Sequence, residues 1–192
     1  MKRFADLVRE ARSCRRFVES EPVGPEILRE IVDCVRVTTS ARNRQPLRYI
    51  TVDDEATRLA LFTHTNWASA LGWGGPPQGE RPTGFIVMLS VAPPSMPVYY
   101  DTGIAAQTMQ LHAASMGIGC CILNNFPRGP VREILQIPED LEIMLLLAFG
   151  VPREERRLAE AGEDGGLQYW RDENGVHHVP KLSLETVLLD ER

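Results

Sequence analysis

Apolar residues recur every three or four positions in the first part of the chain. This spacing predicts one helix over residues 2–12 and a second within residues 22–41, where Pro25 and Glu26 are typical of a helix start. The segment 101–117 is apolar on nearly all sides, so we expect a long central helix, capped by Asp101 or Thr102 and ended by Gly117. Shorter helices are predicted over residues 55–65, 127–141 and 182–192.

Continuous apolar runs alternate with these helices and predict buried strands. The strands are expected at residues 48–54, 85–92, 119–123 and 142–150. A hairpin is expected around Glu173, Asn174 and Gly175, because an Asn-Gly pair between strand-like pieces favours a tight turn. The charged stretch 153–166 is expected to form only a connection.

Together these elements predict an α+β domain whose strands form one sheet wrapped by helices. We expect a single domain over residues 1–192, with a C-terminal arm over about residues 166–192. This arm is too thin to stand alone, so it is expected to pack on the body of the protein or on another subunit.

Composition narrows the function classes. The 192-residue chain has a formal net charge of −5, which gives no support to nucleic-acid binding. It has no apolar run of the ~20 residues that a membrane helix needs, and the start resembles no signal peptide, so we expect a cytoplasmic protein. Four cysteines without a CxxC pair are expected to be reduced and mostly buried, although the arginines around Cys14 favour a lowered thiol pKa there.

Several kinds of site have no support in the sequence. No GxGxxG, GxxxxGK[ST], HExxH or GxSxG motif is present. His177 and His178 are adjacent, so in a strand they point to opposite faces and do not form a metal site together. We therefore expect neither a metal site nor a hydrolytic catalytic group.

A long loop over residues 66–84 is rich in glycine and proline and contains Trp67 and Trp73. Two interpretations are open for it. Long loops in compact domains are often functional lids, which makes the tryptophans candidates for a substrate loop. Tryptophans also pack inside proteins, so a purely structural role is equally open.

The stretch ARSCRRF at residues 11–17 brings three arginines together around a serine. Guanidinium groups match phosphate oxygens in pairs, so Arg12, Ser13 and Arg15 are candidates to converge on a phosphate, while Arg16 points elsewhere. The alternative is that arginines after a helix only neutralise its carboxyl-end dipole.

The stretch SARNRQP at residues 40–46 offers a different chemistry. Asn43 and Gln45 each carry a donor and an acceptor, as needed for the edge of a heterocycle or for sugar hydroxyls. The alternative is that the asparagine only caps a helix end. Phosphate, polyol and heterocycle together outline a mononucleotide-like cofactor.

With these motifs the chain resembles the nitroreductase family of FMN-dependent oxidoreductases over nearly its whole length. RSCRRF is similar to that family's RRSxRxF segment, and TTSARNRQP to its PSxxNxQP segment. MGIGCCILNNF, VREILQIPED and LLLAFGVP follow in the family's order, and YWRDENGVHHVPK resembles the ending of a nitroreductase-like subgroup. The resemblance implies a central, mostly antiparallel sheet and an intertwined homodimer with FMN at its interface.

The resemblance also implies which residues bind FMN. Arg12, Ser13 and Arg15 would bind it from one subunit, and Ser40, Asn43 and Gln45 from the other. Asn124 and Asn125 would lie near the flavin ring, and Lys181 would reach the phosphate.

Four positions depart from the family pattern. The first arginine of the N-terminal motif is Ala11 here, and the proline of the second motif is Thr39. A glycine beside the flavin falls at Asn124, and an arginine of the C-terminal segment falls at Leu182. The expected result is a phosphate site with fewer cationic partners.

The implied activity is electron transfer from NADH or NADPH through FMN to a nitroaromatic, a quinone or a similar conjugated acceptor. The flavin carries the chemistry in this interpretation, so no catalytic side chain is expected. The alternative is a non-catalytic sensor or carrier that binds FMN or another small molecule on the same fold. Another reductive reaction, such as dehalogenation, is a third hypothesis.

Overall fold

The computed structural model describes residues 3–68, 72–162 and 165–192. Its centre is a four-stranded sheet in the order β1-β2-β4-β3, in which every neighbouring pair is antiparallel. The strands are β1 (Leu47–Val52), β2 (Gly84–Ser90), β3 (Gly119–Leu123) and β4 (Glu142–Gly150). The predicted α+β fold with a mostly antiparallel central sheet is confirmed.

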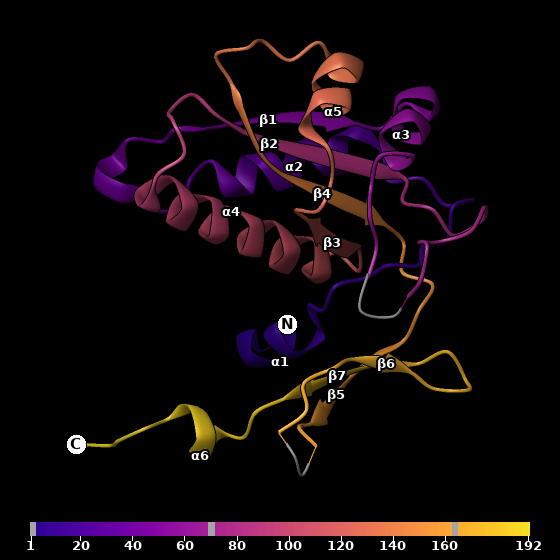
Figure 1. Cartoon of the computed structure of the whole chain (residues 1–192), viewed down its shortest axis with the longest axis vertical. Helices are drawn as coiled ribbons and strands as arrows, with labels where there is room; N and C mark the ends of the chain where they lie inside the picture. Colours follow the sequence, from indigo (N-terminus) through magenta and orange to yellow (C-terminus); the bar gives the residue numbers. More distant parts are fainter. Residues whose placement is uncertain (1–2, 69–71, 163–164) are drawn as a thin grey trace.

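Helices cover both faces of this sheet (Figure 1). One face is packed by α2 (Pro25–Val35) and α4 (Met96–Ser115), and the other by α3 (Glu55–Phe62) and α5 (Arg128–Leu135). Side chains of β2 alternate between the two layers, with Phe85 and Val87 in one and Ile86 and Met88 in the other. A strand buried on both faces has a continuous apolar sequence, which explains why β2 and β4 were predictable.

A second, smaller sheet lies beside the N-terminal helix α1 (Phe4–Glu10). It contains β5 (Arg156–Glu160), β7 (His177–Lys181) and β6 (Trp170–Arg171), in that order. The pair β6–β7 is antiparallel, which confirms the predicted hairpin, and Gly175 has a positive φ of 78° in its turn. The chain continues as an extended segment that contains α6 (Leu184–Val187).

Two predictions about these elements were wrong. The charged stretch after residue 152 was expected to be a connection, but it forms β5, which pairs in parallel with β7. The prediction of a single sheet fails for the same reason. Strand β5 is largely exposed and polar, so it lacks the apolar run that marked the other strands.

The long helix also starts earlier than expected. Helix α4 begins at Met96 with Pro97 in its first turn, where the missing N–H of proline costs nothing. Asp101 and Thr102 are therefore not caps but buried residues inside the helix. Its end agrees with the prediction, because Gly117 follows with a φ of 76°.

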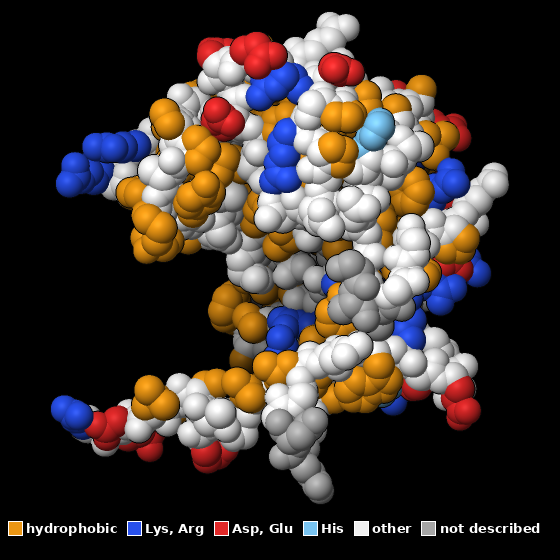
Figure 2. Space-filling view, in the orientation of Figure 1, with side chains coloured by type: hydrophobic (Ala, Val, Ile, Leu, Met, Phe, Trp, Pro, Cys, Tyr) orange, Lys and Arg blue, Asp and Glu red, His pale blue; other side chains and the backbone are white. Residues whose placement is uncertain are grey.

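Apolar side chains also gather on the surface. Figure 2 shows them where α4 begins and along the C-terminal segment. The exposed members are Met96, Tyr99, Tyr100 and Ile104 of α4, and Leu184, Val187, Leu188 and Leu189 of the C-terminal segment. No helix in the described part of the chain is long and apolar enough to cross a membrane.

Candidate functional site

The segment that follows α1 lies along the free edge of the central sheet. Ser13 forms a parallel bridge with Cys120 of β3, and the Cys14 N–H donates to the Cys120 carbonyl at 2.9 Å. The Cys14 side chain is fully buried, and burial raises its thiol pKa to about 12. Cys14 therefore anchors the segment in the core and is not a reactive thiol.

This anchoring places a cavity of about 280 Å³ between α1, α4 and the small sheet. Four of the predicted cofactor residues line it together: Arg12, Ser13, Arg15 and Lys181. Tyr169 and His177 from the C-terminal part of the chain complete one wall. The structure thus brings the N-terminal motif and the C-terminal lysine to one place.

The Arg15 guanidinium is positioned by aromatic groups. Its Nη1 lies 3.2 Å from Nε2 of His177, and its Cζ lies 5.0 Å from the centre of the Tyr169 ring. Because a guanidinium only donates, Nε2 of His177 must accept, and the ring proton is assigned to Nδ1. The Arg15 side chain is thereby held at the cavity wall by neutral partners.

His177 is neutral for a physical reason. Burial lowers its pKa from 6.5 to about 4; the Glu154 carboxylate opposes this, and nearby arginines, Arg15 first, add to it. The unfolded chain binds a proton below pH 6.5, whereas the folded chain does so only near pH 4. Stability from this group is therefore complete above pH 6.5 and declines as the pH falls towards 4.

We expect the free energy of unfolding to drop by up to about 1.4 kcal/mol per pH unit through this window because of His177. Denaturant unfolding of the wild type and of His177→Gln at pH 7, 5.5 and 4.5 measures it. The variant should have the flatter pH dependence, and equal dependence in both proteins contradicts the assignment.

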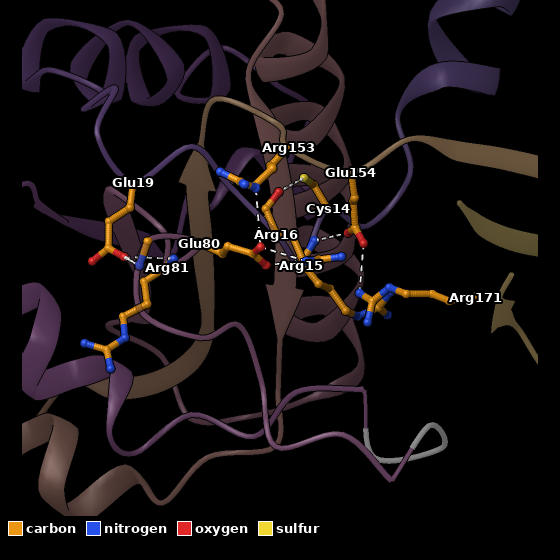
Figure 3. A network of polar contacts seen from close by, with 10 residues as sticks. Cys14, Arg15, Arg16, Glu19, Glu80, Arg81, Arg153, Glu154 and Arg171 are labelled. Atoms are coloured by element: carbon orange, nitrogen blue, oxygen red, sulfur yellow. Dashed lines mark hydrogen bonds and ion pairs between the residues drawn. The ribbon is translucent and has the colours of Figure 1, made fainter. Parts of the chain in front are cut away.

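Two buried carboxylates fix the surroundings of the cavity (Figure 3). Glu154, whose side chain is fully buried, accepts from the Arg15 backbone N–H at 2.5 Å and from Nη2 of Arg171 at 2.8 Å. Glu80 accepts from Nη2 of Arg16 at 2.7 Å, and Nε of Arg153 lies 3.3 Å from the same oxygen. Arg16 points away from the cavity, as predicted.

The cations that line the cavity differ from Arg16, Arg153 and Arg171 in having no carboxylate partner among the described residues. Within residues 3–68, 72–162 and 165–192, no ion pair joins Arg12, Arg15 or Lys181 to a carboxylate. The Arg12 Nε is buried without a hydrogen-bond partner, and burial lowers the pKa of Arg12. Arg12 donates to the Val8 carbonyl and Arg15 to His177, but these contacts leave their charge unbalanced. Such cations gathered in one cavity of an acidic chain favour an anionic ligand, and a serine hydroxyl among them fits a phosphate.

A second cavity, of about 250 Å³, lies between α2, β1 and the loop before β1. Ser40 and Gln45 line it together with Asp101 of α4. Asn43, in the 3-10 turn Ala41–Asn43, accepts from Nε2 of Gln45 at 2.9 Å. The second predicted motif is therefore gathered in one place, and the two cavities have no lining residue in common.

Asp101 holds this loop in an unusual conformation. Its carboxylate accepts from Ser40 Oγ at 2.7 Å and from the Ala41 N–H at 2.9 Å. The backbones of Asn43 and Gln45 have positive φ angles of 55° and 48°, which residues other than glycine rarely adopt. Such strain is found at functional sites and needs support from its surroundings.

Replacing Asp101 with asparagine is expected to lower the free energy of unfolding by about 1–3 kcal/mol. The carboxylate accepts from two donors, Ser40 Oγ and the Ala41 N–H, and the amide NH2 of asparagine would face one of them without being able to accept. Thermal or denaturant unfolding measures this effect. Asp33→Asn is the matched control, since Asp33 is exposed and its ion pair is with Arg36, the residue that follows the same helix. Equal stability of the two variants would show that Asp101 does not hold the loop.

Asn124 and Asn125 follow β3 and are exposed, and neither lines the two cavities. Nη2 of Arg128 donates to Oδ1 of Asn124 at 2.6 Å, which leaves the amide N–H groups of Asn124 free to donate elsewhere. The carbonyl of Asn125 accepts from Asn66. Their predicted place near a flavin ring stays a prediction.

The two tryptophans of the loop differ. Trp67 is 2% exposed and packs in the core near Phe62, which favours the structural interpretation for this residue. Trp73 is only partly buried, and the Arg171 guanidinium lies 4.2 Å from its ring centre. The end of the loop is held by Glu80, while residues 69–71 lie outside the described residues.

Residues around the cavities that the sequence analysis did not name as site residues include Asp101, Glu154, Tyr169 and His177. The signal for Asp101 was available, since an acid inside an otherwise apolar helix needs a buried partner. His177 was treated only as a metal-ligand candidate. In the described part of the chain, no group of three or more His, Cys, Asp or Glu residues is placed to hold a metal ion.

Comparisons with known proteins agree with this architecture. Residues 8–79 and 96–151 match the sequence model of the Nitroreductase family. An Archaeoglobus fulgidus protein, whose name proposes an NADH dehydrogenase or NAD(P)H nitroreductase, is 23% identical over 173 residues, or 85% of this chain and 93% of its own. The 5,6-dimethylbenzimidazole synthase of Rhodospirillum rubrum is 24% identical, covering 76% of this chain and 80% of its own.

Solved structures share the fold. A proposed nitroreductase from Desulfovibrio desulfuricans, solved in complex with FMN, superposes with a TM-score of 0.70 at 20% identity and covers 100% of this chain and 98% of its own. A nitroreductase with bound FMN from Desulfitobacterium hafniense superposes with a TM-score of 0.61 at 20% identity. It covers 80% of this chain and 90% of its own. Since the family match spans more than half of the residues, this chain belongs to the nitroreductase family.

Proposed function

We propose that this protein is an FMN-dependent oxidoreductase that uses NADH or NADPH to reduce a nitroaromatic, a quinone or a similar conjugated acceptor, in the cytoplasm. The observation that carries the proposal is the cavity lined by Arg12, Ser13, Arg15 and Lys181, in which the cations form no ion pair with a carboxylate of the described residues. Relatives that are named as NAD(P)H nitroreductases or solved with FMN support the choice of cofactor and donor.

In this proposal the cavity holds the FMN phosphate. Arg15 and Arg12 supply charged donors, Ser13 a hydroxyl donor and Lys181 a further charge. Bound FMN would supply the chemistry by accepting a hydride from the nicotinamide and delivering electrons to the acceptor. Neutral His177 keeps the Arg15 guanidinium oriented without neutralising it.

The second cavity has a different role in the proposal. Ser40, Asn43 and Gln45 present hydroxyl and amide groups that can contact the flavin of a partner subunit, since their own cavity is separate from the cationic one. Trp73, held by Arg171 at its ring face, is the candidate for a wall of the acceptor site. Trp67 contributes to this wall only by packing from within the core.

We further propose a homodimer. Exposed apolar side chains gather at the start of α4 and on the C-terminal segment, and such gatherings are typical of an interface. The arm over about residues 166–192 would reach the partner, as expected for a segment too thin to be stable alone. Light scattering at micromolar concentration tests this, and a monomer contradicts the shared site.

The activity is tested by the visible absorption spectrum of the FMN-reconstituted protein, before and after anaerobic addition of NADH and then of NADPH. Prompt bleaching of the flavin spectrum is expected, followed by reoxidation when a nitroaromatic or a quinone is added. Bound flavin that stays oxidised favours the sensor or carrier alternative. Absence of bound flavin overturns the proposal.

A further inference from the structure

Arg156 is a cation near the proposed phosphate cavity that the sequence motifs do not mark. It begins strand β5 and is the register partner of His177 in the parallel pair β5–β7. Register partners point to the same face of a sheet. His177, Val179 and Lys181 all face the cationic cavity, so Arg156 leaves the small sheet on that same side.

The Arg156 side chain lines a smaller cavity of about 130 Å³ next to the first. The two cavities share Ala11, Arg12 and Gln110 in their walls. Arg156 and Arg12 therefore line one small cavity, together with Ala11 and Glu10. Two arginines side by side repel each other unless an anion lies between or beside them.

No ion pair of Arg156 is formed within the described residues, although Glu10 lines the same small cavity. Its Nε and Nη1 are buried without a hydrogen bond. Arg153 and Arg157, on the same short stretch, pair with Glu80 and Glu155, respectively. Buried guanidinium nitrogens without partners are costly, so the two such nitrogens of half-buried Arg156 favour a ligand that accepts hydrogen bonds from them.

We propose that Arg156 is a further binding residue for the phosphate of the flavin cofactor, acting together with Arg12 and Ser13. The proposal rests on the proposed function. It assigns to β5, a strand that the sequence did not predict, part of the affinity for FMN. It also predicts that affinity depends on the phosphate and not only on the ring.

The test compares FMN with riboflavin, which has the same ring but no phosphate. Fluorescence titrations give the dissociation constants of both ligands for the wild type, Arg156→Gln and Arg156→Lys. We expect Arg156→Gln to weaken FMN binding by about tenfold to a hundredfold and to change riboflavin binding less than twofold. Arg156→Lys keeps the charge but loses the planar fork, so an intermediate loss is expected.

Arg157→Gln is the matched control. Arg157 is the next residue of the same strand, points to the opposite face, and pairs with Glu155 at 2.6 Å. It should bind FMN like the wild type. Circular dichroism and thermal unfolding establish that the variants are folded. If Arg156→Gln does not fold, the same titrations are carried out on Arg156→Lys.

The outcomes separate the two proposals. If the wild type binds neither ligand, the proposed function fails. If the wild type prefers FMN, but folded Arg156→Gln or Arg156→Lys binds it as tightly as Arg157→Gln does, the inference about Arg156 fails alone. If Arg156→Gln weakens FMN and riboflavin equally, Arg156 supports the fold rather than the phosphate, and the inference is also overturned.

Discussion

Replacing Arg15 with alanine is expected to weaken FMN binding about a hundredfold, the largest effect on the cofactor of any single change. A charged hydrogen bond is worth about 1.5–3 kcal/mol and each factor of ten in affinity about 1.4 kcal/mol. Arg15 can present two donors to a phosphate and is already oriented by His177 and Tyr169. Fluorescence titration with FMN and with riboflavin measures the loss.

The control for this prediction is Arg16→Gln. Arg16 is the next residue, but its guanidinium is bound to Glu80 and not to the cavity. This variant should lose some stability and keep the wild-type ratio of FMN to riboflavin affinity. Unchanged FMN affinity in Arg15→Ala would mean that the phosphate binds elsewhere.

Replacing Glu154 with alanine is expected to cost about 3–5 kcal/mol of the free energy of unfolding, because one partner of a buried ion pair is removed. The Arg171 guanidinium, whose side chain is 17% exposed, would lose its carboxylate, and the Arg15 N–H would lose its acceptor. The small sheet and the N-terminal segment would lose their common contact. Denaturant unfolding at pH 7 measures this loss.

Glu155→Ala is the matched control for Glu154→Ala. Glu155 is the adjacent residue, is largely exposed and pairs with exposed Arg157, so its loss should cost less than about 1 kcal/mol. Glu154→Gln, which retains one acceptor for the Arg15 N–H, is expected to lie between the two. A cost below 1 kcal/mol for Glu154→Ala would show that the buried pair does not hold the two parts together.

Much of the fold was predictable from local pattern. The continuous apolar runs of β2 and β4 and the helical spacing of α2 follow from burial, and burial repeats with the period of the element. Strand β5 was not predictable in this way. Its residues are mostly polar and exposed, and only its distant partner β7 makes it a strand.

The candidate site was predictable in part. The motif around Arg12 and the C-terminal Lys181 were expected to serve one phosphate, and the structure gathers them at one cavity although 169 positions separate them. The placement of Ser40 and Gln45 at a separate cavity depends on how β1 packs against α2 and α4, which no local motif specifies.

The sequence by itself determined the element types of the central sheet and its helices, the family and the residues of its motifs, because these depend on local spacing and composition. Three pairs of neighbouring residues carry the same charge, and the tertiary structure decided which member of each pair lies at or supports the cationic cavity. Arg15 faces the cavity and Arg16 binds Glu80; Glu154 is buried and Glu155 exposed; Arg156 is unpaired and Arg157 paired. Neighbours of the same chemistry are equivalent in a sequence, and only the direction in which the folded backbone projects each side chain separates them.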